Sequence, residues 1–155
     1  PNKHPPSTNW IVIRPANMTG VPAAGSRMTP SLAAAARLPI ILSISNQGAF
    51  GTVFGAHHYR LVALEVSVPA TINNTGLIRL GSGYETTLAQ MPHDLVLDRM
   101  YIHGTATGNV RRAVGLNSAS SAVVDSYIAD IHEGGTDSQA IAGWGGPGPF
   151  QIVNN

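Results

Sequence analysis

Acidic side chains follow apolar runs at two points in the second half of the chain. Asp98 and Arg99 end one such run, and Asp125 ends another. Two carboxylates that flank a glycosidic bond can act as acid and base, or they can bind Ca²⁺ between them. Because two neighbouring carboxylates repel each other, such a pair would hold a proton or a cation. We take Asp98, Arg99 and Asp125 as candidate catalytic residues, with a structural ladder of stacked polar side chains as the default interpretation.

Two histidines extend this candidate catalytic set. His103 and His132 each follow apolar strand residues, but they lie 5 and 7 residues after their preceding aspartates, so only a bulge would make them neighbours. A neutral imidazole near a carboxylate can serve as a general base. Capping of a turn through a ring nitrogen is the structural alternative. The pair His57-His58 precedes a strand, and we interpret it as turn structure.

A second acidic group lies in the segment after Asp125. Asp130, Glu133 and Asp137 surround Gly134-Gly135 and offer oxygen ligands of the kind that Ca²⁺ prefers. Their spacing is not that of an EF-hand loop. The sequence therefore makes these three residues the candidate metal ligands, with a solvated polar turn as the alternative.

Trp144 and an arginine pair are the candidate substrate-binding residues. Trp144 lies in a segment rich in glycine and proline, residues 143–149. An exposed indole can stack on the apolar face of a sugar, although it can equally plug the end of the core. Arg111 and Arg112 begin a strand that follows Asp98, and with Arg99 they could bind the carboxylate of an anionic sugar. Ordinary surface arginines paired with nearby acids are the alternative.

The elements that must position these residues repeat along the chain. The three copies of one phrase are Leu95–Ile102, Ala122–Ile128 and Phe150–Asn155. Their residues Asp98, Asp125 and Asn154 are 27 and 29 residues apart, which is a period typical of solenoids. One copy is too short to bury its own apolar face, so the copies must stack.

Short β-branched runs, punctuated by Gly, Asn, Ser and Pro, predict strands throughout the chain. These runs cover residues 10–14, 40–44, 59–66, 76–80, 94–102, 113–116, 122–131, 140–142 and 150–153. Most alternate apolar and polar residues, which buries one face, with Leu95, Leu97 and Ile102 pointing inward. A rung of about 27 residues with at least two strands predicts an all-β, right-handed parallel β-helix. A β-sandwich is the alternative, but its hairpins would not require a phrase at a fixed period.

The first third of the chain departs from this rhythm. Residues 29–37 have a threonine N-cap, a proline at the first helical position and an alanine run, so they predict a short helix. Residues 85–90 predict a single-turn excursion. Both are decorations on the coil. Residues 1–9 are polar and predict a linker, and residues 10–155 predict the β-helix domain, which we expect to be truncated in its last rung.

Composition narrows the classes of partner. Charged residues make up 11% and the net charge is +1, which argues against a nucleic-acid surface. No apolar run reaches the roughly 20 residues of a membrane helix, so we expect no membrane partner. The chain has no cysteine, which excludes disulfides, thiolate metal sites and a cysteine nucleophile. An exposed end of the solenoid would allow self-association between copies of the chain.

The chain resembles the right-handed parallel β-helix proteins of the pectate-lyase-like superfamily, particularly secreted bacterial ones. The residues that carry this resemblance are Gly55–Leu61, Pro92–Gly104 and Asp137–Phe150. The resemblance implies a secreted bacterial protein that binds an acidic polysaccharide and cleaves it as a lyase or a hydrolase. Lyases of the superfamily typically use an Arg or Lys base and Ca²⁺. A non-catalytic surface, adhesin or glycan-binding module is the alternative, because the superfamily includes proteins without known activity.

Overall fold

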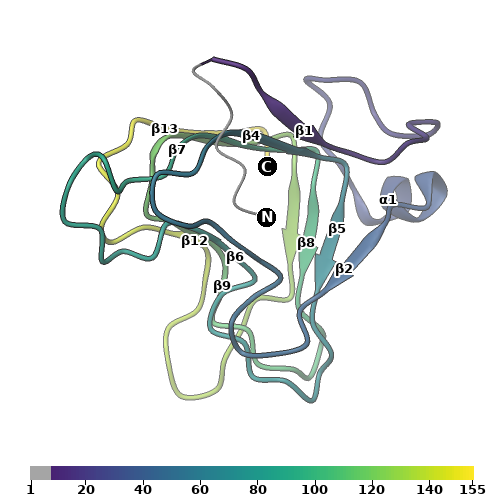
Figure 1. Cartoon of the computed structure of the whole chain (residues 1–155). Coiled ribbons are helices and arrows are strands. Elements are labelled where there is room, and N and C mark those ends of the chain that lie inside the picture. Colours follow the sequence, from purple (N-terminus) through teal and green to yellow (C-terminus); the bar gives the residue numbers. More distant parts are fainter. Residues whose placement is uncertain (1–7) are drawn as a thin grey trace.

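The computed structural model describes residues 8–155, so most of the predicted linker, residues 1–7, lies outside the described residues. In the described part the chain forms one helix and a series of short strands (Figure 1). The helix is α1 (Pro30–Ala36). The strands are β1 (Ile11–Ile13), β2 (Ile40–Leu42), β3 (Phe50–Gly51), β4 (His57–Val62), β5 (Glu65–Ser67), β6 (Ile78–Leu80), β7 (His93–Asp98), β8 (Tyr101–His103), β9 (Arg112–Leu116), β10 (Ala119–Val124), β11 (Tyr127–Ala129), β12 (Gln139–Ala142) and β13 (Phe150–Val153).

The strands form three parallel sheets that make up the sides of a coil. The first sheet has the order β1-β4-β7-β10-β13, the second β2-β5-β8-β11 and the third β3-β6-β9-β12. Each strand inside a sheet therefore pairs with the strand one turn earlier and the strand one turn later. The chain is a right-handed parallel β-helix, as the repeated phrase predicted, and Figure 1 shows the three sheets nearly end-on. A complete rung holds three strands.

The core is a set of apolar columns that run along the coil. Leu61, Leu97 and Val123 are register partners in the first sheet, and all three are buried. Val66 and Ile102 continue the core in the second sheet. The inward direction predicted for Leu97 and Ile102 is confirmed, since both are fully buried. Burial of such columns stabilises the stack because no rung can cover its own apolar face.

The corner between the first and second sheets is a column of left-handed backbone. Ala63, Arg99, Asp125 and Asn154 have φ values between 49° and 55°. Such a residue turns the chain sharply enough for two strands to follow each other with almost no loop. Each of the runs 59–66, 94–102 and 122–131, predicted as one strand, is therefore divided into two strands at this corner.

The strand register corrects the predicted Asp98, Asp125, Asn154 column by one residue. Asp98 pairs with Val124, and Tyr101 pairs with Tyr127. Asp125 and Asn154 therefore share a corner position that Arg99 occupies in the preceding rung. The repeated phrase preserves the apolar and tyrosine positions, whereas its acidic residue has moved by one place.

Residues 14–39, which we call the corner bridge, leave the coil and cover this corner from outside. They contain α1, whose Thr29 Oγ1 accepts a hydrogen bond from the Leu32 N–H (3.2 Å), as the sequence predicted. Met28 and Ala33 pack on Val62 and Ala63 of the coil. In the described part, no helix is both long enough and apolar enough to cross a membrane.

The corner between the third and first sheets carries loops of very unequal length. Asn117 and Ser118 alone join β9 to β10, whereas residues 81–92 and 143–149 form the loops of the rungs on either side. The long loops close over the short one. A Cβ at Gly81 would overlap the carbonyl oxygen of Asn117, and a Cβ at Gly146 would come within 2.5 Å of the Ser118 nitrogen. The predicted excursion at residues 85–90 belongs to the first of these loops and contains a turn without a helix.

We expect Gly81→Ala to destabilise the fold much more than Gly25→Ala. Both glycines have positive φ, 90° and 86°, so each alanine pays a similar backbone cost of about 1 kcal/mol. A Cβ at Gly25 meets no atom within 4 Å, whereas one at Gly81 overlaps Asn117 and should cost about 2 kcal/mol more. Urea unfolding of the two variants measures this difference, and equal stabilities would contradict the close packing of the loops.

Candidate functional site

Asp98, the first predicted catalytic residue, is a buried ion-pair centre. Its carboxylate accepts hydrogen bonds from Arg60 (2.7 Å from Nη2) and from Arg99 (2.8 Å from Nε), and its side chain is 1% exposed. Burial alone raises the pKa of Asp98, but the hydrogen bonds from Arg99 and Arg60 outweigh it, so this pKa lies below its usual value. The carboxylate is therefore charged and enclosed, as expected for a structural group.

Asp125 is held by the corner bridge. One carboxylate oxygen accepts a hydrogen bond from the Gly25 N–H (2.6 Å), and the other accepts one from Asn154 Nδ2 (2.8 Å). The Asp125 side chain is buried, as is that of Asp98. Asp125 and Asn154 are stacked as the ladder interpretation expects, whereas Asp98 lies outside their column. A catalytic role for Asp98, Arg99 and Asp125 stays a prediction.

The two candidate histidines are not brought together. His103 Nδ1 lies 2.7 Å from the Gly104 carbonyl oxygen, and its Nε2 lies 3.1 Å from the carboxylate of Glu65, a residue that sequence analysis missed. The register places His103 opposite Ala129. His132 Nε2 lies 3.0 Å from the Thr105 carbonyl oxygen. Both rings therefore cap backbone turns.

The predicted Ca²⁺ ligands do not form a cluster in the described part of the chain. The nearest charged partner of Glu133 is Arg111, at 3.9 Å, and Asp130 and Asp137 are exposed. Among residues 8–155, one group of three residues has its potential ligand atoms close enough together to bind one ion, and it consists of His58, His93 and Asp94. His57 and His58, interpreted as turn structure, are instead the first residues of β4. The sequence did carry an indication of this group, because β7, the neighbouring strand in the sheet, also begins with a histidine.

Trp144 lies on the outside of the third sheet. Its backbone N–H and that of Gly145 donate to Asn117 Oδ1, at 2.9 and 3.2 Å, and Asn117 is buried. The far edge of the indole lies over Gly115 of β9, where a Cβ would be 3.5 Å from the ring, and Gly83 abuts its nitrogen. Trp144 as a whole remains 55% exposed. Two glycines and one buried amide thus hold an indole flat against the coil.

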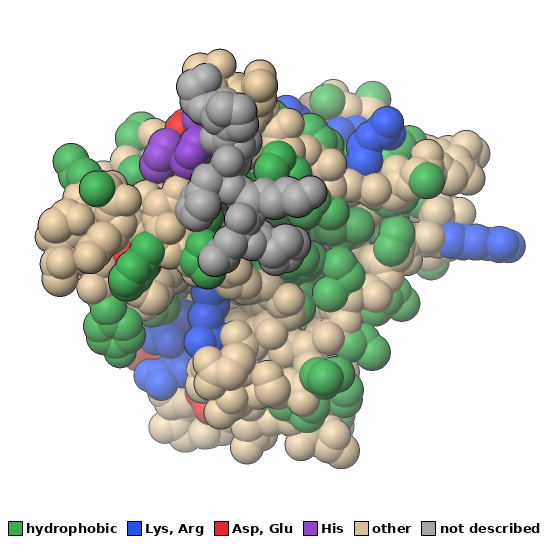
Figure 2. Space-filling model, viewed as in Figure 1, with side chains coloured by type: hydrophobic (Ala, Val, Ile, Leu, Met, Phe, Trp, Pro, Cys, Tyr) green, Lys and Arg blue, Asp and Glu red, His purple; other side chains and the backbone are tan. Residues whose placement is uncertain are grey.

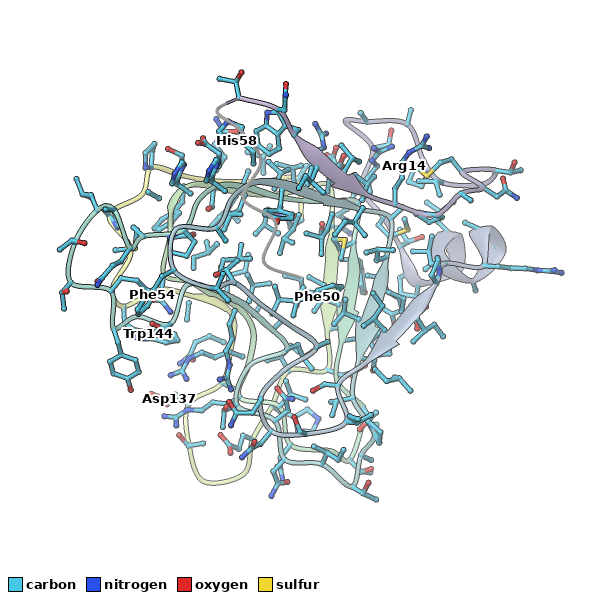
Figure 3. All side chains as sticks on the ribbon, in the orientation of Figure 1. Arg14, Phe50, Phe54, His58, Asp137 and Trp144 are labelled. Atoms are coloured by element: carbon cyan, nitrogen blue, oxygen red, sulfur yellow. The ribbon has the colours of Figure 1, made fainter. Side chains whose placement is uncertain are left out.

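One arginine packs on this indole, and a second lies on the neighbouring strand. The guanidinium carbon of Arg112 lies 5.0 Å from the ring centroid of Trp144, which is a cation–π distance. Arg79 of β6 is the register partner of Gly115, the residue beneath the ring. Figure 2 shows Lys and Arg side chains gathered in this part of the surface, next to hydrophobic ones, and Figure 3 places Trp144 there. We call Arg79, Arg112 and Trp144 the arginine–tryptophan face.

Some polar atoms near this face form no hydrogen bond in the described part of the chain. Arg112 Nε and Gln139 Oε1 are two such buried atoms. Gln139 is the register partner of Arg112 across β9 and β12. Buried polar atoms are normally hydrogen-bonded to protein or to ordered water, so these atoms are unusual for a folded chain.

A hollow of about 770 Å³ opens beside Trp144. The two long loops form its walls, with Glu85 and Leu88 on one side and Pro147 on the other, and its floor includes Leu116 and Ile141 at the edge of the core. The arginine–tryptophan face therefore continues into a concave surface that has the size of a site for a small ligand.

Comparisons with known proteins give no relative. No family model matches the chain, and the searches of curated proteins and of solved structures found no match.

We expect Asp98→Asn to lower the free energy of unfolding by about 3 kcal/mol at neutral pH, because the variant leaves two arginines around an uncharged amide. The pKa of Asp98 is lower in the folded state than the usual 3.8, so its stabilising effect is complete above pH 3.8 and is lost as the pH falls below it. The stability difference between wild type and variant should therefore shrink in acid.

Urea unfolding of both proteins across the acid range measures this difference. The exposed Asp137→Asn is the matched control and should change stability by less than about 0.5 kcal/mol. A difference between wild type and Asp98→Asn that stays constant down to low pH would contradict the ion pair.

Proposed function

We propose that this chain is a pectate-lyase-like β-helix protein that binds an acidic polysaccharide outside the cell, at the arginine–tryptophan face. The observation that carries the proposal is the exposed indole of Trp144 with the Arg112 guanidinium 5.0 Å from its centroid. An indole stacks on the apolar face of a sugar ring, and a guanidinium pairs with a carboxylate. A uronic acid residue presents both surfaces.

The position of the face supports a chain-like ligand. Parallel strands repeat at about 4.8 Å, so side chains on successive rungs form a ladder along the coil. Arg79 and Trp144 belong to different rungs of that ladder, and the hollow of about 770 Å³ continues it between the long loops. A polysaccharide lying along the third sheet would contact all of these groups.

We expect Trp144→Ala to weaken binding of polygalacturonate on the order of tenfold, because it removes the stacking surface. Arg112→Gln should weaken binding of this acidic polymer by a similar factor, because it removes a charged hydrogen-bond donor. Affinity electrophoresis in gels with polygalacturonate measures both effects. Trp10→Ala, a change at the other exposed tryptophan, is the matched control and should bind as wild type.

A neutral polymer separates the two contributions. With unmodified galactan in the gel, Arg112→Gln should migrate as wild type does. If Trp144→Ala retained full affinity for polygalacturonate, the proposed site would be wrong.

Incubation of the same proteins with polygalacturonate, with and without Ca²⁺, tests for cleavage. Ultraviolet absorbance of unsaturated products indicates a lyase, and new reducing ends without that absorbance indicate a hydrolase. Binding with neither product supports a glycan-binding module.

A further inference from the structure

A group of histidines and one aspartate lies at the start of two neighbouring strands of the first sheet. His58 belongs to β4, and His93 and Asp94 begin β7. Figure 2 shows histidine side chains together with an acidic one at the upper left, and Figure 3 labels His58 there, far from Trp144. This group is therefore separate from the arginine–tryptophan face.

The backbone of the coil places these side chains on one side. His58 and Asp94 have φ values of 58° and 52°, and Ser120 in the next rung has 48°. A left-handed residue interrupts the alternation of a strand, so neighbouring side chains can meet, and His93 Nδ1 lies 2.7 Å from Asp94 Oδ2. Ser120 has the same backbone conformation but no metal-binding side chain. The conformation is therefore a general feature of the coil, whereas the histidine and aspartate side chains are specific to this site.

The distances suit a single metal ion. Nδ1 of His58 lies 3.9 Å from Oδ2 of Asp94, and one ligand atom from each of the three residues lies within 4.8 Å of the others. Two ligands on a tetrahedral Zn²⁺, at about 2.1 Å each, are about 3.4 Å apart. Small rotations of half-buried side chains therefore bring the three atoms to bonding distance.

The surroundings hold the rings in place. The ring of His57 stacks on that of His93, its register partner, with centroids 4.8 Å apart and an angle of 1° between the planes. Trp10 packs edgewise on His58, at 5.3 Å between centroids. These ring contacts restrict the rotation of the His58 and His93 imidazoles.

We propose that His58, His93 and Asp94 bind a divalent transition metal ion of the Zn²⁺ class. Two imidazoles and one carboxylate suit Zn²⁺, Ni²⁺ or Cu²⁺, whereas Ca²⁺ prefers oxygen ligands alone. Three protein ligands leave a fourth position for water, which is the coordination of an open zinc site. The metal joins two rungs of the first sheet.

Isothermal titration calorimetry with Zn²⁺ on the whole chain tests this site. We expect one Zn²⁺ per chain, and a loss of affinity of about tenfold or more in His93→Ala and in Asp94→Asn. His132→Ala, which removes a histidine outside the group, is the matched control and should bind as wild type. Ca²⁺ should give no binding at this site. Unchanged Zn²⁺ affinity in both ligand variants, or no Zn²⁺ binding by wild type, would overturn the proposal.

A second measurement places the ion. In a Trp144→Phe background, Trp10 is the remaining tryptophan, and it lies against His58. Cu²⁺ quenches nearby indole fluorescence, so Cu²⁺ should quench Trp10 in this background and lose that effect when His93→Ala is added. Circular dichroism of each variant checks that the coil is intact. Quenching that persists in a folded His93→Ala variant would place the ion elsewhere.

Discussion

The enclosed carboxylate of Asp98 is the interaction on which one edge of the coil depends. It receives Arg60 from the preceding rung and Arg99 from its own rung, and Arg99 also donates to the Pro22 carbonyl oxygen of the corner bridge. One negative charge thus joins two turns of the solenoid and the segment outside them. Because a buried charge without partners is very costly, the three side chains constrain one another's position. Arg99 thereby adds one hydrogen bond to the contacts that hold the bridge against the corner.

The opposite edge of the coil uses backbone contact in place of charge. Gly81 and Gly146 let two loops close over Asn117 and Ser118, and Asn117 in turn fixes the segment that carries Trp144. A rigid coil supplies the platform, and unequal loops supply the concave surface. This division agrees with the general observation that loops on a regular scaffold carry binding residues. The proposed glycan site and the proposed metal site lie on different sheets, so each can be altered without the other.

The sequence predicted the class of fold because apolar spacing survives from rung to rung. Leu97 and Val123, and likewise Tyr101 and Tyr127, are register partners, and they are the residues that made the repeat visible. The polar residues gave a wrong alignment of the repeats, because Asp98 and Asp125 are both aspartates but do not occupy the same register position. Arg112 and Trp144 were both identified as candidates, but their contact depends on the path of a glycine-rich loop. The partnership of His58 with His93 required the register of β4 on β7, which the short strands did not reveal.

The corner bridge also changes how the stack behaves as a folding unit. Rungs of a solenoid contact only their neighbours, so such proteins can unravel from either end one repeat at a time. Here Gly25 is bonded to Asp125, and Arg27 to the carbonyl oxygen of Asn155, across separations of 100 and 128 residues. These bonds need the rungs from β1 to β13 to be stacked, and loss of the rung that holds β13 breaks them. The bridge therefore couples the rung of β1 to the rung of β13 and makes this part of a nearest-neighbour architecture more cooperative.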